Sequence, residues 1–265
     1  MINKVGFEYL NKKGESVFET FLKYTSEKEK SSAVLGEILG WLLITEGVAV
    51  LDVGTGNGEF LKLSLNRIKH LKAAEFTLLE PSSDLVKRLQ TAAKCFPPNS
   101  IVKVAHSTFE EFKATSQFDV ILASHLPFTR DRLPVVFGKM LDLLKPDGCL
   151  IVVLRGWDDV HEFRTRFKSQ LMERGYQSLT IYDAIEVFDE FAKDKSLSIT
   201  MHNADSELCL PITGNTQDAI SIIEFLLNKK WEEFPDNVRE AVLDYVNQRR
   251  GVLRQIDGFA LVRKT

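Results

Sequence analysis

The chain has 265 residues, of which 44% are hydrophobic and 27% charged, with a formal net charge of −3 at pH 7. Such a composition is that of a globular protein, and it gives no electrostatic reason to expect nucleic acid or a membrane surface as the partner. No apolar run approaches the roughly 18 residues that span a bilayer. The first 16 residues lack the apolar core of a secretory signal. We therefore expect a cytoplasmic protein.

The three cysteines, Cys95, Cys149 and Cys209, lie far apart in the sequence. Their number and spacing favour reduced thiols and give no sign of a disulfide framework or a metal site. We therefore expect no metal.

Residues 15–45 predict two helices, because apolar side chains recur there at helical spacing. From residue 48 short apolar runs alternate with amphipathic stretches. Strands are predicted at 48–53, 75–80, 100–105, 118–124 and 149–154, and helices at 57–68, 82–96, 109–112, 130–144 and 157–172. The alternation predicts an α/β fold with a doubly wound, mostly parallel sheet.

After residue 175 the alternation stops. Helices are predicted at 182–193, 216–229 and 235–249, and strands at 197–202, 207–212 and 259–263. We expect a helical N-terminal segment (1–46), a nucleotide-binding core (47–174), a substrate cap of helices and strands (175–250) and a closing strand of the core sheet (251–265). The N-terminal segment is expected to form part of the cap.

The stretch AVLDVGTGNGEF, residues 49–60, places Gly54, Gly56 and Gly58 between a predicted strand and a predicted helix. Glycine there allows unusual backbone dihedrals and lets a ligand approach the main chain. The helix that follows offers free N–H groups and positive potential. Dinucleotides and adenosyl cofactors are the two ligand classes that use such a turn.

Three acidic residues bear on the choice between these two classes, although Glu80 by itself does not separate them. Glu59 stands where the dinucleotide fingerprint has a further glycine, and its carboxylate would face a pyrophosphate. Glu80 follows Gly58 by 22 residues, the spacing of the usual acceptor for ribose hydroxyls. Asp52 could meet the amino group of S-adenosylmethionine, or it could only cap the turn. The set favours S-adenosylmethionine over NAD as the cofactor.

Four segments, VLDVGTGNGEF, TLLEPSSD, FDVILASHLPF and LLKPDGCLIVV, resemble class I S-adenosylmethionine-dependent methyltransferases over about residues 48–154. The resemblance implies a Rossmann-like, seven-stranded sheet and a methyl-transfer reaction. It implies that the glycine loop cradles the amino-acid portion of the cofactor, that Glu80 binds the ribose and that Ser107 and Thr108 flank the adenine. The residues expected to bind the cofactor are Asp52, Gly54, Thr55, Gly56, Gly58, Glu80, Pro81, Ser82, Ser107, Thr108, Ser124 and His125.

A second resemblance covers nearly the whole chain. The segments LLEPSSDLVKRL, LIVVLRGWDDVHEFRTRF and FLLNKKWEEFPDNVREAV follow the order found in histamine N-methyltransferases. This resemblance implies a small acceptor methylated on an amine or imidazole-like nitrogen. Gln255 aligns with an amide of the last strand in that family, which implies a contact with substrate.

His125 follows a predicted strand and is the candidate catalytic base, although it could equally well only pack or hydrogen-bond there. Aromatic side chains are the other candidates for the acceptor pocket, because their faces attract amines. Phe128 and Trp157 are expected to line it, with Phe7 and Tyr9 on a closing lid. We expect a monomer that binds no nucleic acid. The alternatives are a non-catalytic sensor or partner protein that binds the cofactor and, less favoured, an NAD-dependent oxidoreductase.

Overall fold

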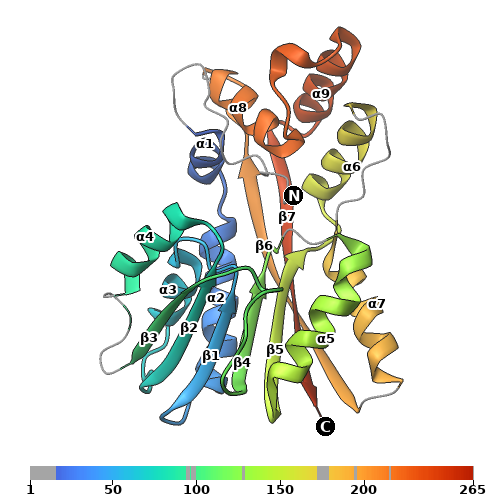
Figure 1. Cartoon of the computed structure of the whole chain (residues 1–265). Helices are drawn as coiled ribbons and strands as arrows, with labels where there is room; N and C mark the ends of the chain where they lie inside the picture. Colours follow the sequence, from blue (N-terminus) through green and yellow to red (C-terminus); the bar gives the residue numbers. More distant parts are fainter. Residues whose placement is uncertain are drawn as a thin grey trace. The chain divides into compact units, whose positions relative to one another are not determined.

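The computed structural model describes residues 16–93, 96, 100–126, 129–171, 179–193, 196–214 and 216–264 (Figure 1). Its contacts divide the chain into two compact units. The first, called here the helical unit, comprises Met1–Glu27, Gly156–Ser178 and Asp205–Ile256. The second, the sheet unit, comprises Lys28–Arg155, Leu179–Ala204 and Asp257–Thr265.

Strands and helices alternate along the first two thirds of the chain. The strands are β1 (Val48–Val53), β2 (Ala74–Glu80), β3 (Ile101–His106), β4 (Phe118–Ser124), β5 (Leu144–Arg155), β6 (Leu197–Cys209) and β7 (Val252–Lys264). The helices are α1 (Val17–Tyr24), α2 (Glu27–Leu42), α3 (Glu59–Leu65), α4 (Ser83–Ala92), α5 (Leu133–Leu143), α6 (Asp159–Leu171), α7 (Ile181–Ala192), α8 (Thr216–Leu227) and α9 (Asp236–Gln248), with short 3-10 turns at Arg130–Arg132 and Trp231–Glu233.

The described strands form one sheet in the order β3-β2-β1-β4-β5-β7-β6. β1, β2, β3, β4 and β5 pair in parallel, whereas β7 runs antiparallel to β5. Because strand order reverses direction at β1, the carboxyl ends of β1 and β4 border the crevice where such sheets bind ligands. The expected doubly wound, mostly parallel, seven-stranded Rossmann-like sheet is therefore confirmed.

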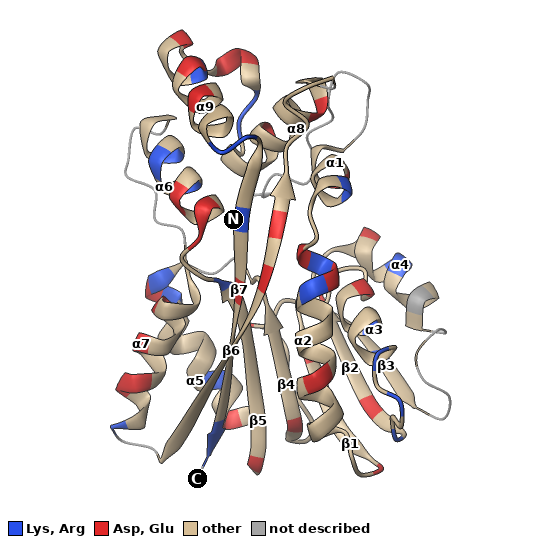
Figure 2. Cartoon of the chain, turned by 180° about the vertical axis from the view of Figure 1, so that it is seen from behind, with Lys and Arg blue, Asp and Glu red and all other residues tan. Residues whose placement is uncertain are grey.

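Helices cover both faces of the sheet within the sheet unit, as the two views show (Figures 1 and 2). One apolar core lies between the sheet and α2, α3 and α4, and includes Leu39, Leu61 and Leu89. The other lies between the sheet and α5 and α7, where the rings of Phe137 and Phe188 stack with centroids 4.6 Å apart. Strands buried on both faces read as continuous apolar runs, which is why the core strands were predictable.

The helical unit has its own core, built from α1, α6, α8 and α9. Phe163, Phe167 and Tyr245 pack together there, with ring centroids 5.0–5.6 Å apart. The Tyr245 hydroxyl donates to the Asp159 carbonyl at 3.2 Å, which joins α9 to the start of α6.

Several element predictions were wrong. Residues 109–112 form a turn instead of a helix, and the predicted strands 197–202 and 207–212 are one strand, β6. β5 begins at Leu144, five residues before the predicted strand 149–154, and its pairing with β4 has a register irregularity in that extension. The division by contacts places α2 in the sheet unit and α6 in the helical unit. The expected domain ranges stay a prediction.

Acidic and basic side chains alternate in the first turn of α2, whereas α6 begins with acidic residues and has its basic residues further along (Figure 2). Among the described residues, no helix has the length and apolar character that crossing a bilayer would require.

Candidate functional site

The glycine loop joins β1 to α3 in the sheet unit. Gly54, Gly56 and Gly58 have φ angles of +67°, +62° and +75°, in the left-handed region that favours glycine. A Cβ on Gly54 would lie 2.4 Å from Leu126 Cδ2, and one on Gly58 would lie 2.7 Å from Leu89 Cδ1. A Cβ on Gly56 would meet no described heavy atom within 4 Å. The main chain at Gly56 is therefore the part of the loop that a ligand can approach.

The carboxylate of Glu80 organises the loop from the end of β2. Glu80 is buried, and its Oε2 accepts a hydrogen bond from the Gly56 amide at 2.9 Å. Its Oε1 accepts from the Ser82 amide, also at 2.9 Å. Ser82 in turn caps α4, and His106 Nε2 lies 3.1 Å from the Pro81 carbonyl oxygen. Glu80, Pro81 and Ser82 thus form one connected edge beside the glycine loop.

Asp52 is buried on β1, and the Thr55 hydroxyl donates a hydrogen bond to its Oδ2. Burial, opposed by the Thr55 hydrogen bond and assisted by the nearby Glu80, raises the pKa of Asp52 to about 7. A carboxyl group in that state is half ionised near neutral pH and would gain from a cationic partner. The hydrogen bond to Thr55 agrees with the turn-capping alternative, and the raised pKa agrees with an amino-group site.

Glu59 contacts the loop itself, because Asn57 Nδ2 lies 3.5 Å from its Oε2. It is the first residue of α3, and its Oε2 lies 2.6 Å from Lys28 Nζ. The hydrogen bond to Lys28 lowers the pKa of Glu59 despite its partial burial. Because Lys28 neutralises this carboxylate, Glu59 alone does not exclude a phosphate ligand.

The loop after β3 carries Ser107 and Thr108. The Ser107 hydroxyl donates to the Thr108 carbonyl, and the Thr108 hydroxyl donates to Glu111 Oε2, both at 3.0 Å. Lys139 of α5 fastens the turn that follows, because its Nζ donates to the carbonyls of Phe109, Glu110 and Phe112 at 2.5–3.0 Å. The sequence analysis missed Lys139, since only the fold brings α5 to this loop.

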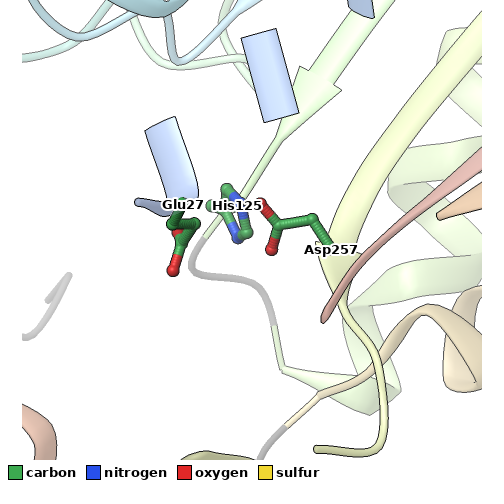
Figure 3. A group of neighbouring side chains, drawn as sticks. All are labelled: Glu27, His125 and Asp257. Atoms are coloured by element: carbon green, nitrogen blue, oxygen red, sulfur yellow. Dashed lines mark ion pairs between the residues drawn. The ribbon is translucent and has the colours of Figure 1, made fainter. Parts of the chain in front are cut away.

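Ser124 ends β4 and His125 follows it. The His125 backbone has a φ of +49°, and its amide donates to the Val153 carbonyl at 2.8 Å. Its Nε2 lies 3.4 Å from Oδ2 of Asp257, as Figure 3 shows. The next residue, Leu126, packs on Gly54, so the segment that carries His125 borders the glycine loop. Of the sequence-predicted residues, the fold therefore brings Ser124 and His125 to the same edge as the loop.

The residues of this edge fit an adenosyl cofactor that carries an amino-acid group. The main chain at Gly56 is open, Glu80 is a buried acceptor and Asp52 is a titratable carboxyl group. Residues 50–148 match the methyltransferase domain family. This part of the chain is thus similar to methyltransferase domains. The match agrees with the expected cofactor, S-adenosylmethionine.

Solved structures share the fold of this chain at low sequence identity. A Bacillus halodurans C-125 protein assigned as a methyltransferase is 12% identical, with a TM-score of 0.57 over 87% of this chain and 98% of that one. The cyclopropane synthase MmaA2 from Mycobacterium tuberculosis is 15% identical, with a TM-score of 0.54 over 89% and 85%. The plantazolicin methyltransferase BpumL, solved with SAH, is 13% identical, with a TM-score of 0.50 over 92% and 88%. No curated protein matches the chain by sequence.

The structure describes only some of the residues that are expected to contact the acceptor. Phe7, Tyr9 and Phe128 lie outside the described residues. Trp157 is 67% exposed and lines a groove of about 590 Å³ in the helical unit, together with acidic and basic side chains of α6. Gln255 is buried; it accepts from the Thr25 hydroxyl at 2.5 Å and donates to Glu27 Oε2 at 2.7 Å. The substrate roles of these five residues stay predictions.

Asp257 is a second candidate residue that the sequence analysis missed. It lies in β7, 132 residues after His125, so no local pattern links the two. A signal was present nonetheless. Asp257 is an acidic residue within the otherwise mostly apolar run that closes the chain, and a buried acid in a strand calls for a partner.

Proposed function

We propose that this protein is an S-adenosylmethionine-dependent methyltransferase that acts on a nitrogen of a small amine or imidazole-like acceptor, and that His125 takes the proton which the acceptor loses. The pair of His125 and Asp257, in the segment that borders the glycine loop, carries this proposal. A protonated amine has no lone pair with which to attack, so a base must remove its proton. Imidazole is the side chain most often used for that step at neutral pH.

The cofactor would be held by residues of the sheet unit. Glu80 would accept from the ribose hydroxyls, the main chain at Gly56 would border the amino-acid portion, and Asp52 would pair with its amino group. Ser107 and Thr108 would flank the adenine. S-adenosylmethionine supplies a methyl group on a sulfonium, which is a good leaving group. The chain is then required to orient the acceptor, exclude water and receive a proton.

The acceptor class rests on the resemblance to histamine N-methyltransferases, with Trp157 and Gln255 as candidate contacts. Both α2 and α6 carry acidic as well as basic residues, which supports a small molecule over nucleic acid. We further propose that the protein is a monomer located in the cytoplasm.

His125→Gln tests the proposal. Methyl transfer from labelled S-adenosylmethionine is measured over a panel of small amines and imidazoles, and affinity for S-adenosylhomocysteine is measured by calorimetry. We expect turnover to fall by roughly 10²–10⁴-fold, the usual contribution of a general base, with affinity almost unchanged. His202→Gln is the matched control, because His202 contacts Trp41 edge-on at a centroid distance of 6.3 Å, away from β4.

Two results would go against the proposal. Equal turnover in the His125 variant and the parent between pH 6 and 9 would remove His125 as the base. Binding of the cofactor without turnover on any acceptor would favour the non-catalytic sensor instead.

A further inference from the structure

The carboxylate beside His125 is one of the most buried charged groups of the sheet unit. Asp257 is 1% exposed, whereas the His125 side chain is 39% exposed. The two side chains come from segments on either side of β5, since the sheet order places β4, β5 and β7 side by side. A buried carboxylate must have compensating partners, so its surroundings indicate what it is built to hold.

Three groups act on Asp257 from different elements. The Ser31 hydroxyl of α2 donates to Oδ2 at 2.5 Å, and Arg155 is the residue opposite Asp257 in the β5–β7 pairing. Burial alone would raise the pKa of Asp257, but His125, Arg155 and Ser31 together lower it. Among the described atoms, Oδ1 of Asp257 accepts no hydrogen bond. The group is thus an ionised carboxylate with accepting capacity left over.

His125 is also fixed through its backbone. A φ of +49° is uncommon for a residue other than glycine, although histidine adopts it more readily than most. The hydrogen bond from the His125 amide to the Val153 carbonyl, at 2.8 Å, holds that conformation. Backbone outliers of this kind cluster at functional sites, where the surrounding structure enforces them. The backbone therefore sets where the imidazole lies, and Asp257 sets which of its nitrogens faces the carboxylate.

We propose that Asp257 is a positioning residue that keeps the neutral His125 ring in one tautomer, with its hydrogen on Nε2. Ser31 and Arg155 hold the Asp257 carboxylate in place for this role. The inference rests on the proposed function of His125 as base. With Nε2–H directed at the carboxylate, the ring's lone pair is on Nδ1. When the acceptor nitrogen gives up its proton, Nδ1 takes it and the ring becomes an imidazolium. Asp257 stays ionised throughout and compensates that positive charge.

A carboxylate that orients a histidine is a general device for fixing the reactive tautomer. The pair of His125 and Asp257 has the arrangement that this device requires, with Nε2 nearest the carboxylate. The 3.4 Å separation is longer than an ordinary N–H···O hydrogen bond, as is common for catalytic pairs before substrate binds. We therefore expect the pair to shorten when the site is loaded.

Tautomer state can be measured on the resting protein without any acceptor. Histidine labelled with ¹⁵N is examined by long-range ¹H–¹⁵N correlation at alkaline pH, with and without S-adenosylhomocysteine, and His125→Gln assigns the signal. We expect the Nε2–H form in the parent and a mixture or the Nδ1–H form in Asp257→Asn. Asp119→Asn is the matched control, because Asp119 is a hydrogen-bonded aspartate near the opposite end of β4. An Nδ1–H ring in the parent, or an unchanged ring in Asp257→Asn, would overturn the proposal.

Kinetics supply the second readout. Asp257→Asn should lower kcat by at least about 30-fold, while KM and the affinity for S-adenosylhomocysteine stay within about twofold. If Asp257→Asn fails to fold, Ser31→Ala replaces it and should give a partial tautomer mixture with a three- to tenfold loss of kcat. A kcat within twofold of the parent in a folded Asp257→Asn contradicts the proposal. Because the tautomer is read without turnover, failure of the methyl-transfer proposal and failure of this one remain distinct.

Discussion

The Gly56 amide donates a hydrogen bond to Oε2 of Glu80 at 2.9 Å, so the end of β2 directly holds the glycine loop at the end of β1. The other oxygen of the same carboxylate accepts from Ser82 at the start of α4. One side chain thereby sets three segments in place before any ligand binds. The ribose acceptor expected from the sequence is also the organiser of the loop.

Glu80→Ala should weaken S-adenosylhomocysteine binding by roughly 1.5–3 kcal/mol, the range for hydrogen bonds to a charged group. Glu80→Gln should be intermediate, because its amide keeps one acceptor but replaces the other with a donor that faces an N–H. Calorimetry gives both affinities. Glu75→Gln on the exposed side of β2 is the control. Unchanged affinity in Glu80→Ala would contradict the ribose assignment.

The affinity for the cofactor should depend on pH through the ionisation of Asp52. Its pKa of about 7 belongs to the free protein, and a bound amino group would favour the ionised form. Binding then releases a proton, and the affinity for S-adenosylhomocysteine falls by roughly tenfold for each pH unit below 7. Calorimetry between pH 5.5 and 7.5 measures this slope. A flat profile would remove Asp52 from the amino-group site.

Asp52→Asn should make the protein more stable at pH 8 while it weakens cofactor binding. The folded pKa of about 7 lies above the unfolded value, so the folded state binds more protons between those values and loses stability as pH rises through 7. Removing the charge avoids that loss, and each kcal/mol is worth roughly 2–4 °C in Tm. Thermal melts at pH 5 and pH 8 should differ less in the variant. An equal pH dependence in both proteins would contradict this assignment.

The three loop glycines should respond differently to alanine. Gly56→Ala meets no neighbour and bears only the left-handed backbone cost of about 1 kcal/mol, yet it places a methyl group where the cofactor approaches. Gly54→Ala adds a clash with Leu126 and should unfold at lower denaturant concentration. Leu126→Ala should partly restore the Gly54 variant. Urea melts measure the stability of each variant, and calorimetry measures its affinity for S-adenosylhomocysteine. Equal losses of stability in the Gly54 and Gly56 variants would contradict this prediction.

Lys139→Met should loosen the loop that carries Ser107 and Thr108. Three backbone carbonyls lose their donor, and we expect a threefold to tenfold loss of S-adenosylhomocysteine affinity together with faster amide exchange at 109–112. Lys193→Met removes only a surface pair with Glu190 and serves as control. If the two variants exchange alike, the loop does not depend on Lys139.

The parallel strands and the glycine loop could be predicted because their signals are local. The runs at 48–53 and 118–124 are apolar enough to be buried on both faces, and glycine marks the turn between β1 and α3. β6 was divided wrongly because polar residues at 203–206 read as a turn. That stretch stays extended and alternates buried Ala204 and Ser206 with exposed Asp205, which pairs with Arg254 of β7 at 2.6 Å.

The candidate site was predictable only in part for a related reason. Glu80 ends its strand and His125 directly follows one, so position in the sequence identifies them. Asp257 and Lys139 act on residues far from them in the chain, and tertiary folding alone brings them close. The ion pair of Glu59 with Lys28 was likewise not predictable, because Lys28 lies on another helix.

The antiparallel pairing of β7 with β5 sets Asp257 opposite Arg155 and Gly258 opposite Leu154. Side chains of a strand alternate between faces, so insertion or deletion of one residue near the start of β7 would turn the carboxylate to the other face of the sheet. The fold could tolerate such a change of register, but His125 would lose its contact with the Asp257 carboxylate. Among descendants of this gene, length changes before β7 are therefore the ones to inspect first for loss of activity.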